Sequence, residues 1–83
     1  MSKNRGFQVA KSSIEFYAID DPIGREAIVK IVEKHGNNWD MKFVEDDVIT
    51  TAVFYLESSS AATEKRVLTR ELITDFKQAL GEV

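Results

Sequence analysis

One stretch of the chain gathers residue types that bind ligands in many proteins. Residues 20–24 read Asp-Asp-Pro-Ile-Gly and stand directly before a periodic apolar run. A glycine loop leading into a helix can bind phosphate, but the known phosphate motifs need several glycines at fixed spacing, and this stretch has one. An acid followed by proline is also typical of a helix start, because the carboxylate accepts from free backbone N–H groups and proline lacks the N–H that would be unpaired there. We therefore expect Asp20 and Asp21 to begin a helix rather than to bind a ligand.

Residues for nucleophilic catalysis are scarce. The chain has one histidine, His35, no cysteine and no Gly-x-Ser-x-Gly motif. Nucleophilic catalysis requires a base beside the nucleophile, and nothing in the spacing places His35 beside a serine. We interpret His35 as a helix-end or surface residue, and we expect neither enzymatic activity nor a cofactor.

A cluster of acids occupies the middle of the sequence. Residues 40–57 hold five acids against one lysine, in a chain whose net charge is −3. Carboxylates suit hard cations, but Asp40, Glu45, Asp46 and Asp47 lack the ligand spacing and the glycine of a calcium loop. We expect no metal site and interpret Glu45, Asp46 and Asp47 as a charged hairpin that selects a partner, although the sequence leaves a bound cation open.

The elements that position these residues follow from the apolar periodicity. Residues 7–19 alternate as strand, either as one strand or as two joined at Lys11–Ser13, and residues 1–6 form a polar tail expected to fray. Apolar residues at 3.6 spacing predict one helix after Pro22 that closes at His35-Gly36, with a stripe of Ile23, Ala27, Ile28, Ile31 and Val32. A longer helix is predicted over 61–81, with a stripe of Val67, Leu68, Leu72, Ile73, Phe76, Ala79 and Leu80. Between them, residues 39–57 predict a hairpin that turns near Asp46-Asp47. The order β(β)-α-β-β-α predicts one α+β domain over 1–83, an antiparallel sheet of three to four strands with two helices on one face.

The second strand of the predicted hairpin is apolar on both faces. Val48, Ala52, Phe54 and Leu56 point one way, whereas Ile49, Val53 and Tyr55 point the other way. If the register allows, Tyr17 and Ile19 of the earlier strand lie on that second face as well. A sheet face exposed to water should instead carry polar residues, so this face predicts contact with another molecule. Trp39, in the turn before the hairpin, either covers the core or anchors the same contact, since tryptophan is enriched at binding sites. The predicted apolar contact residues are Tyr17, Ile49, Val53, Tyr55 and Trp39.

The order of elements also suggests an alternative. A strand, a glycine-bearing segment, a helix, a hairpin and a long helix resemble the K-homology RNA-binding module over roughly residues 14–80. That resemblance would imply nucleic-acid binding through a Gly-x-x-Gly loop, but here Gly24 is followed by Arg25, Glu26 and then Ala27. In this alternative the contacts would come from the basic residues Lys3, Arg5, Lys11, Lys65, Arg66 and Arg70.

The leading hypothesis is a small, acidic, non-enzymatic protein-binding or regulatory module. It would act through an apolar sheet face and an acidic hairpin. Because a domain of this length has little stability to spare, the partner could be a second copy of the chain. With no cysteine, no apolar run of membrane-spanning length and no signal peptide, we expect a cytoplasmic protein without a membrane partner.

Overall fold

Four strands and two helices alternate as β-β-α-β-β-α in the computed structural model. The structure describes residues 4–37, 39–56 and 62–81, and for residues 62–65 it describes the backbone alone. No helix in these ranges is both long and apolar enough to cross a lipid bilayer. The elements are β1 (Arg5–Val9), β2 (Ser13–Ile19), α1 (Pro22–His35), β3 (Asp40–Glu45), β4 (Ile49–Tyr55) and α2 (Ala62–Ala79).

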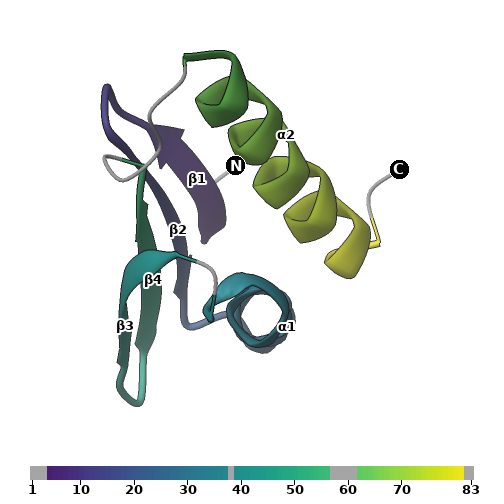
Figure 1. The fold of residues 1–83 in the computed structure, drawn as a ribbon. Helices are drawn as coiled ribbons and strands as arrows, with labels where there is room; N and C mark the ends of the chain where they lie inside the picture. Colours follow the sequence, from purple (N-terminus) through teal and green to yellow (C-terminus); the bar gives the residue numbers. More distant parts are fainter. Residues whose placement is uncertain (1–3, 38, 57–61, 82–83) are drawn as a thin grey trace.

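The strands form one antiparallel sheet in the order β1-β2-β4-β3. Both helices lie on the same side of it, with α1 seen end-on and α2 running across the view (Figure 1). This confirms the predicted α+β class and the placement of both helices on one face. The residues that favour strand between 7 and 19 form two strands, and a hydrogen bond from the Ala10 N–H to the Ser13 carbonyl (2.8 Å) closes their turn.

The sheet begins earlier than the sequence indicated. Arg5 and Gly6, inside the segment expected to fray, pair with Ala18 and Tyr17 of β2. The Ile19 N–H also donates to the Asn4 carbonyl at 2.6 Å. Polar residues can extend a strand because the backbone hydrogen bonds of the ladder do not depend on apolar side chains. Residues 1–3 lie outside the described residues.

The start of α1 matches the predicted cap. A carboxylate oxygen of Asp21 accepts from the Gly24 N–H at 3.1 Å, and Pro22 is the first helical residue. Gly24 is therefore part of α1 rather than of a loop before it. A Cβ at this position would lie 3.0 Å from the Cβ atoms of Ala18 and Arg5, so glycine allows α1 to approach the sheet closely.

The core lies between the helices and the inner face of the sheet. Phe16 packs against Phe76 of α2 with ring centroids 4.8 Å apart and against Phe54 of β4 at 6.0 Å. Two residues of the predicted helical stripes are exposed instead, Ile23 at 59% and Val67 at 51%. The buried side of α1 is centred on Gly24, Ile28 and Ile31, so Ile23 falls beside the contact with the sheet rather than within it.

Candidate interaction surface

The sheet face opposite the helices is the candidate site, here called the outer face. No described segment covers it in Figure 1. Residues paired across neighbouring strands point to the same side, so the strand register and the burial pattern fix its members. They are Gly6 and Gln8 on β1, Ser13, Glu15, Tyr17 and Ile19 on β2, Ile49, Thr51, Val53 and Tyr55 on β4, and Asp40, Lys42 and Val44 on β3.

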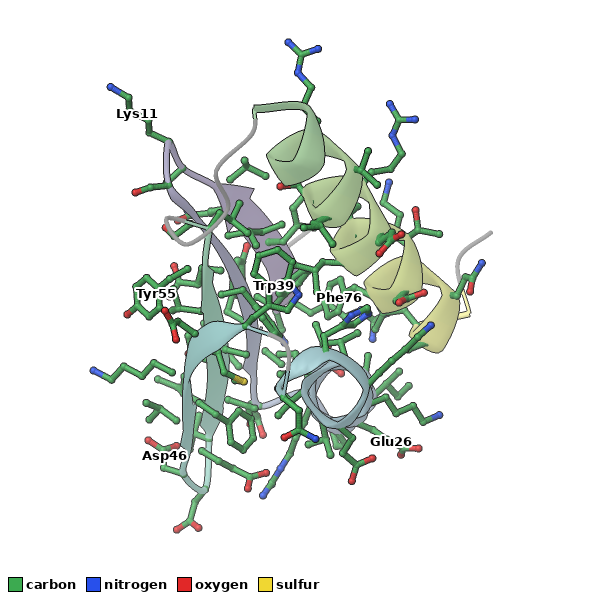
Figure 2. All side chains as sticks on the ribbon, viewed as in Figure 1. Lys11, Glu26, Trp39, Asp46, Tyr55 and Phe76 are labelled. Atoms are coloured by element: carbon green, nitrogen blue, oxygen red, sulfur yellow. The ribbon has the colours of Figure 1, made fainter. Side chains whose placement is uncertain are left out.

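Four of the five predicted apolar contact residues meet on this face. Tyr17, Ile49, Val53 and Tyr55 come from the two central strands, β2 and β4. Ile49 is 42% exposed and Tyr55 38%, while Tyr17 and Val53 are half-buried by neighbours within the sheet. Figure 2 shows Tyr55 pointing away from both helices. Isolated surface apolar residues are ordinary, whereas a set that is continuous across strands is a candidate interaction surface.

The register extends this set by Ile19, which was expected on this face, and by Val44, which was not. Ile19 pairs with Ile49 and is 42% exposed, and Val44 pairs with Thr51 and is 46% exposed. The sequence shows the alternation of the strand that carries Val44 but not which strand lies beside which. The membership of Val44 therefore becomes clear only once the order β1-β2-β4-β3 is known.

Tyr17 lies across a glycine on the outer face. A Cβ built on Gly6, its partner on β1, would lie 2.9 Å from the Tyr17 hydroxyl oxygen and 3.2 Å from Cζ of the ring. The aromatic ring therefore occupies the space that a side chain at position 6 would fill. Such a cross-strand pair fixes the ring flat against the sheet.

Trp39 does not belong to this face. It is half-buried and packs against the core cluster, which corresponds to the first of its two interpretations. In Figure 2 its ring lies on the side of the sheet that carries the helices. The strand alternation agrees with this placement. Asp40, the next residue, pairs with Tyr55 and lies on the outer face, so Trp39 lies on the opposite side.

The predicted acidic hairpin lies at one end of the sheet, and two of its carboxylates already have partners. Glu45 accepts from Nε of Arg25 on α1 at 2.7 Å. Asp46 accepts from the N–H groups of Val48 and Ile49 at 2.8 and 2.7 Å, which closes the turn. The hydrogen bonds from Ile49 and Val48 also hold the pKa of Asp46 below its ordinary value of 3.8. Asp47 is exposed beside them.

A small hollow of about 80 Å³ separates this hairpin from the start of α1. Its wall includes Asp20, Asp21, Asp47 and Arg25, with the buried Thr50 among them. Asp20 has a left-handed backbone (φ 49°), and its N–H donates to the Val48 carbonyl at 2.6 Å. Within the described ranges no three acids or histidines are grouped closely enough to hold a metal ion.

The basic residues of the alternative hypothesis occupy several parts of the molecule. Arg5 forms an ion pair with Asp21 at 3.2 Å, whereas Lys11 lies in the β1–β2 turn at the other end of the strand (Figure 2). Arg66 and Arg70 are exposed on α2. Lys3 and the side chain of Lys65 lie outside the described residues. Phosphate binding requires several cationic side chains along one surface. Arg5, one of the six basic residues of this hypothesis, is already paired with Asp21.

His35 joins the two helices. Its Nε2 lies 2.6 Å from an Asp75 carboxylate oxygen of α2, and Nζ of Lys34 lies 3.1 Å from the same oxygen. Burial alone would raise the pKa of Asp75. The hydrogen bonds from His35 and Lys34 outweigh that effect and lower the pKa below 3.8. His35 ends α1 as expected, but its side chain is only 12% exposed because it turns inward against α2.

The chain was compared with known families, curated proteins and solved structures. No family model, no curated protein and no solved structure matches the chain.

Proposed function

We propose that this protein is a small non-enzymatic protein-binding module that associates with a second copy of itself through the outer face of its sheet. The observation that carries the proposal is the position of both helices on one side of the sheet, which leaves a continuous apolar set on the other. Tyr17, Ile49, Val53 and Tyr55 form its centre, and Ile19 and Val44 extend it.

The residues of the outer face favour sheet-on-sheet contact. Two sheets pack face to face at about 10 Å, with side chains of both faces interdigitating. Branched and aromatic residues such as Val53 and Tyr55 suit that packing, and burying a valine or a tyrosine stabilises a contact by roughly 1.5–3 kcal/mol. The hairpin acids contribute less to this proposal, because Glu45 and Asp46 are engaged within the chain.

The available area indicates a moderate affinity. Four strands of five to seven residues, about 4.8 Å apart and rising about 3.3 Å per residue, present roughly 400 Å² of flat surface. Stable complexes bury about 800 Å² of accessible surface per partner. We therefore expect a dimer that dissociates in the micromolar range, so that monomer and dimer exchange with protein concentration.

A matched pair of substitutions tests the proposal. Val53→Asp places a carboxylate at the centre of the outer face and should abolish association, because a buried unpaired charge is strongly unfavourable. Val67→Asp makes the same chemical change at an exposed residue of α2 and should leave the dimer intact. Sedimentation equilibrium measures the mass, and circular dichroism verifies that both variants are folded.

The mass of the wild-type protein is the first measurement that can reject the proposal. A monomeric wild-type chain over the whole accessible concentration range rejects the proposal. So does a Val53→Asp variant that remains folded and dimeric. If Val53→Asp unfolds the chain, Val53→Thr keeps the branched shape and should still weaken the dimer, since it adds a hydroxyl to the contact.

A further inference from the structure

Two opposite charges flank the centre of the outer face. Glu15 of β2 and Lys42 of β3 both pair with Val53 of β4, one from each side. With strands about 4.8 Å apart, their backbones lie roughly 10 Å from each other. Neither side chain has an ion-pair partner among the residues that the structure describes.

This row has the symmetry that a two-fold dimer requires. In a two-fold contact each residue meets the residue that lies on the opposite side of the axis. If the axis runs along β4, between the two sheets, a position on β2 faces a position on β3 of the other copy. Glu15 would then face Lys42 of the second copy, and Lys42 would face its Glu15.

We propose that the two copies pack about a two-fold axis parallel to β4, with Glu15 of each copy paired to Lys42 of the other. This inference rests on the proposed self-association and adds its geometry. It commits the outer face to one occupant, a second copy of this chain, because the two charges of the row are complementary to each other across that axis.

The neighbouring rows agree with the same axis. Tyr17 and Val44 flank Thr51, so each tyrosine faces the valine of the other copy, an apolar contact. Ser13 and Asp40 flank Tyr55, so each carboxylate faces a hydroxyl that can donate to it. Residues on β4 itself, including Val53, meet their own counterparts.

The competing axis is unfavourable. A two-fold axis lying across the strands places Glu15 against its own counterpart and Lys42 against its own counterpart. Like charges directly opposite each other across a contact destabilise it. Aligned sheet packing rotates the two sheets by about 30°, so the rows nearest the point where the two β4 strands cross carry most of this discrimination. The row of Glu15, Val53 and Lys42 is the middle one of the three rows that span β2, β4 and β3.

Charge reversal distinguishes this geometry from a general charge effect. Glu15→Lys changes the net charge from −3 to −1. If only overall repulsion mattered, this variant would associate more tightly. Loss of two symmetric ion pairs should instead weaken the dimer about tenfold. Glu33→Lys on the exposed side of α1 makes the same net change away from the sheet and serves as the control.

Mixing the variants tests whether opposite charges between the copies restore the contact, whereas the Glu15→Lys homodimer, alone and against wild type, separates the two axes. Lys42→Glu alone should also weaken the dimer, whereas an equimolar mixture of Glu15→Lys and Lys42→Glu should form the heterodimer, in which both pairs are opposite in charge. The double variant E15K/K42E should regain wild-type affinity. Native mass spectrometry with one variant labelled with ¹⁵N separates the two homodimers from the heterodimer, and sedimentation equilibrium gives the constants.

Each outcome is decisive for one level of the argument. The proposed axis is overturned if Glu15→Lys leaves the dimer unaffected. It is also overturned if the mixture associates no better than the single variants. Self-association itself is tested separately by Val53→Asp. Glu15→Lys pairing more tightly with wild type than wild type does with itself assigns the axis across the strands. A monomeric wild type overturns both proposals.

Discussion

Tyr17 and Gly6 show how a single glycine can shape a surface. The ring lies where a side chain at position 6 would be, so it is held against the sheet and presents its face outward. The atoms closest to a Cβ at position 6 are the hydroxyl and ring atoms of Tyr17, at the end of a side chain that can rotate. Adding a methyl group at position 6 should therefore move the ring rather than unfold the sheet.

Gly6→Ala should therefore weaken self-association severalfold while changing the free energy of unfolding by less than about 1 kcal/mol. Sedimentation equilibrium measures the first quantity and urea unfolding the second. Gly81→Ala, a glycine with open space around it but a left-handed backbone (φ 82°), provides a contrast that should affect unfolding and leave association unchanged. Equal association of Gly6→Ala and wild type would contradict this role for Tyr17.

Asp46 closes the hairpin between β3 and β4 through two backbone N–H groups. Because its pKa is lowered in the folded protein, its contribution is complete above the unfolded pKa of about 3.9 and is lost as the pH falls through the lower folded value. Asp46→Ala should raise the hydrogen-exchange rates of the Val48 and Ile49 amides about tenfold. Asp46→Asn keeps an acceptor oxygen and should preserve most of their protection; identical exchange in all three proteins would show that the carboxylate does not hold the turn.

Asp75 links α2 to the end of α1 through His35 and Lys34. Its pKa is also lowered, so the stabilisation is present at neutral pH and disappears only in acid, below about pH 4. Asp75→Ala should reduce the free energy of unfolding at pH 7 by roughly 1–3 kcal/mol. The difference between variant and wild type in urea unfolding should shrink at pH 3, and a difference that stays constant from pH 7 to pH 3 would contradict this assignment.

These residues mark the limit of what the sequence predicted at this scale. The Asp21 cap was predictable because the acid, the proline and the helix they begin are adjacent in the chain. The ion pairs of Asp21 with Arg5, Glu45 with Arg25 and Asp75 with His35 join residues 16, 20 and 40 positions apart. No spacing rule relates residues so distant, because their contact follows from how the elements pack.

At the scale of elements, α2 is held to the sheet by aromatic rings. Phe76 lies 4.8 Å from the ring of Phe16 and 6.5 Å from that of Phe7. Phe76 is the central buried residue of the predicted α2 stripe, and its periodicity was sufficient to predict both the helix and the side that it buries. The edges of that stripe were not predictable: Val67 fits the periodicity but is 51% exposed.

Phe76→Ala should destabilise the domain by about 3–5 kcal/mol, since it leaves a cavity where three rings meet. That is a large share of the roughly 5–15 kcal/mol typical of a small domain. Val67→Ala, on the same helix but 51% exposed, should cost less than about 0.5 kcal/mol. Urea unfolding of both variants tests this, and equal costs would indicate that α2 does not depend on the ring cluster.

At the scale of the whole molecule, two layers leave one sheet face without helices. The alternation of β4 predicted that face from the sequence, because Ile49, Val53 and Tyr55 share a phase that the core residues do not. The order of the strands was not predictable, and it decides which residues become neighbours on the face. Glu15 and Lys42 lie 27 positions apart in the sequence and are placed on either side of Val53 only by the order β2-β4-β3.

The same two-layer arrangement explains why two of the predicted contact residues do not lie on the outer face. Trp39 and Glu45 turn toward the helices because they occupy the inner phase of the β3 segment, where the core and Arg25 meet them. The outer face therefore keeps four of the five predicted apolar residues and includes Val44, and its charges come from Glu15, Asp40 and Lys42 rather than from the hairpin turn.

The central claim, that a second copy covers the outer face, is tested most directly by nuclear Overhauser contacts between chains in an equal mixture of ¹³C-labelled and unlabelled protein. We predict contacts between copies from the methyl groups of Val53 and Ile49 and from the Tyr55 ring, and none from Val67 on α2. Contacts between copies that arise only from the helices, or no such contacts in a sample whose mass is that of a dimer, would contradict it.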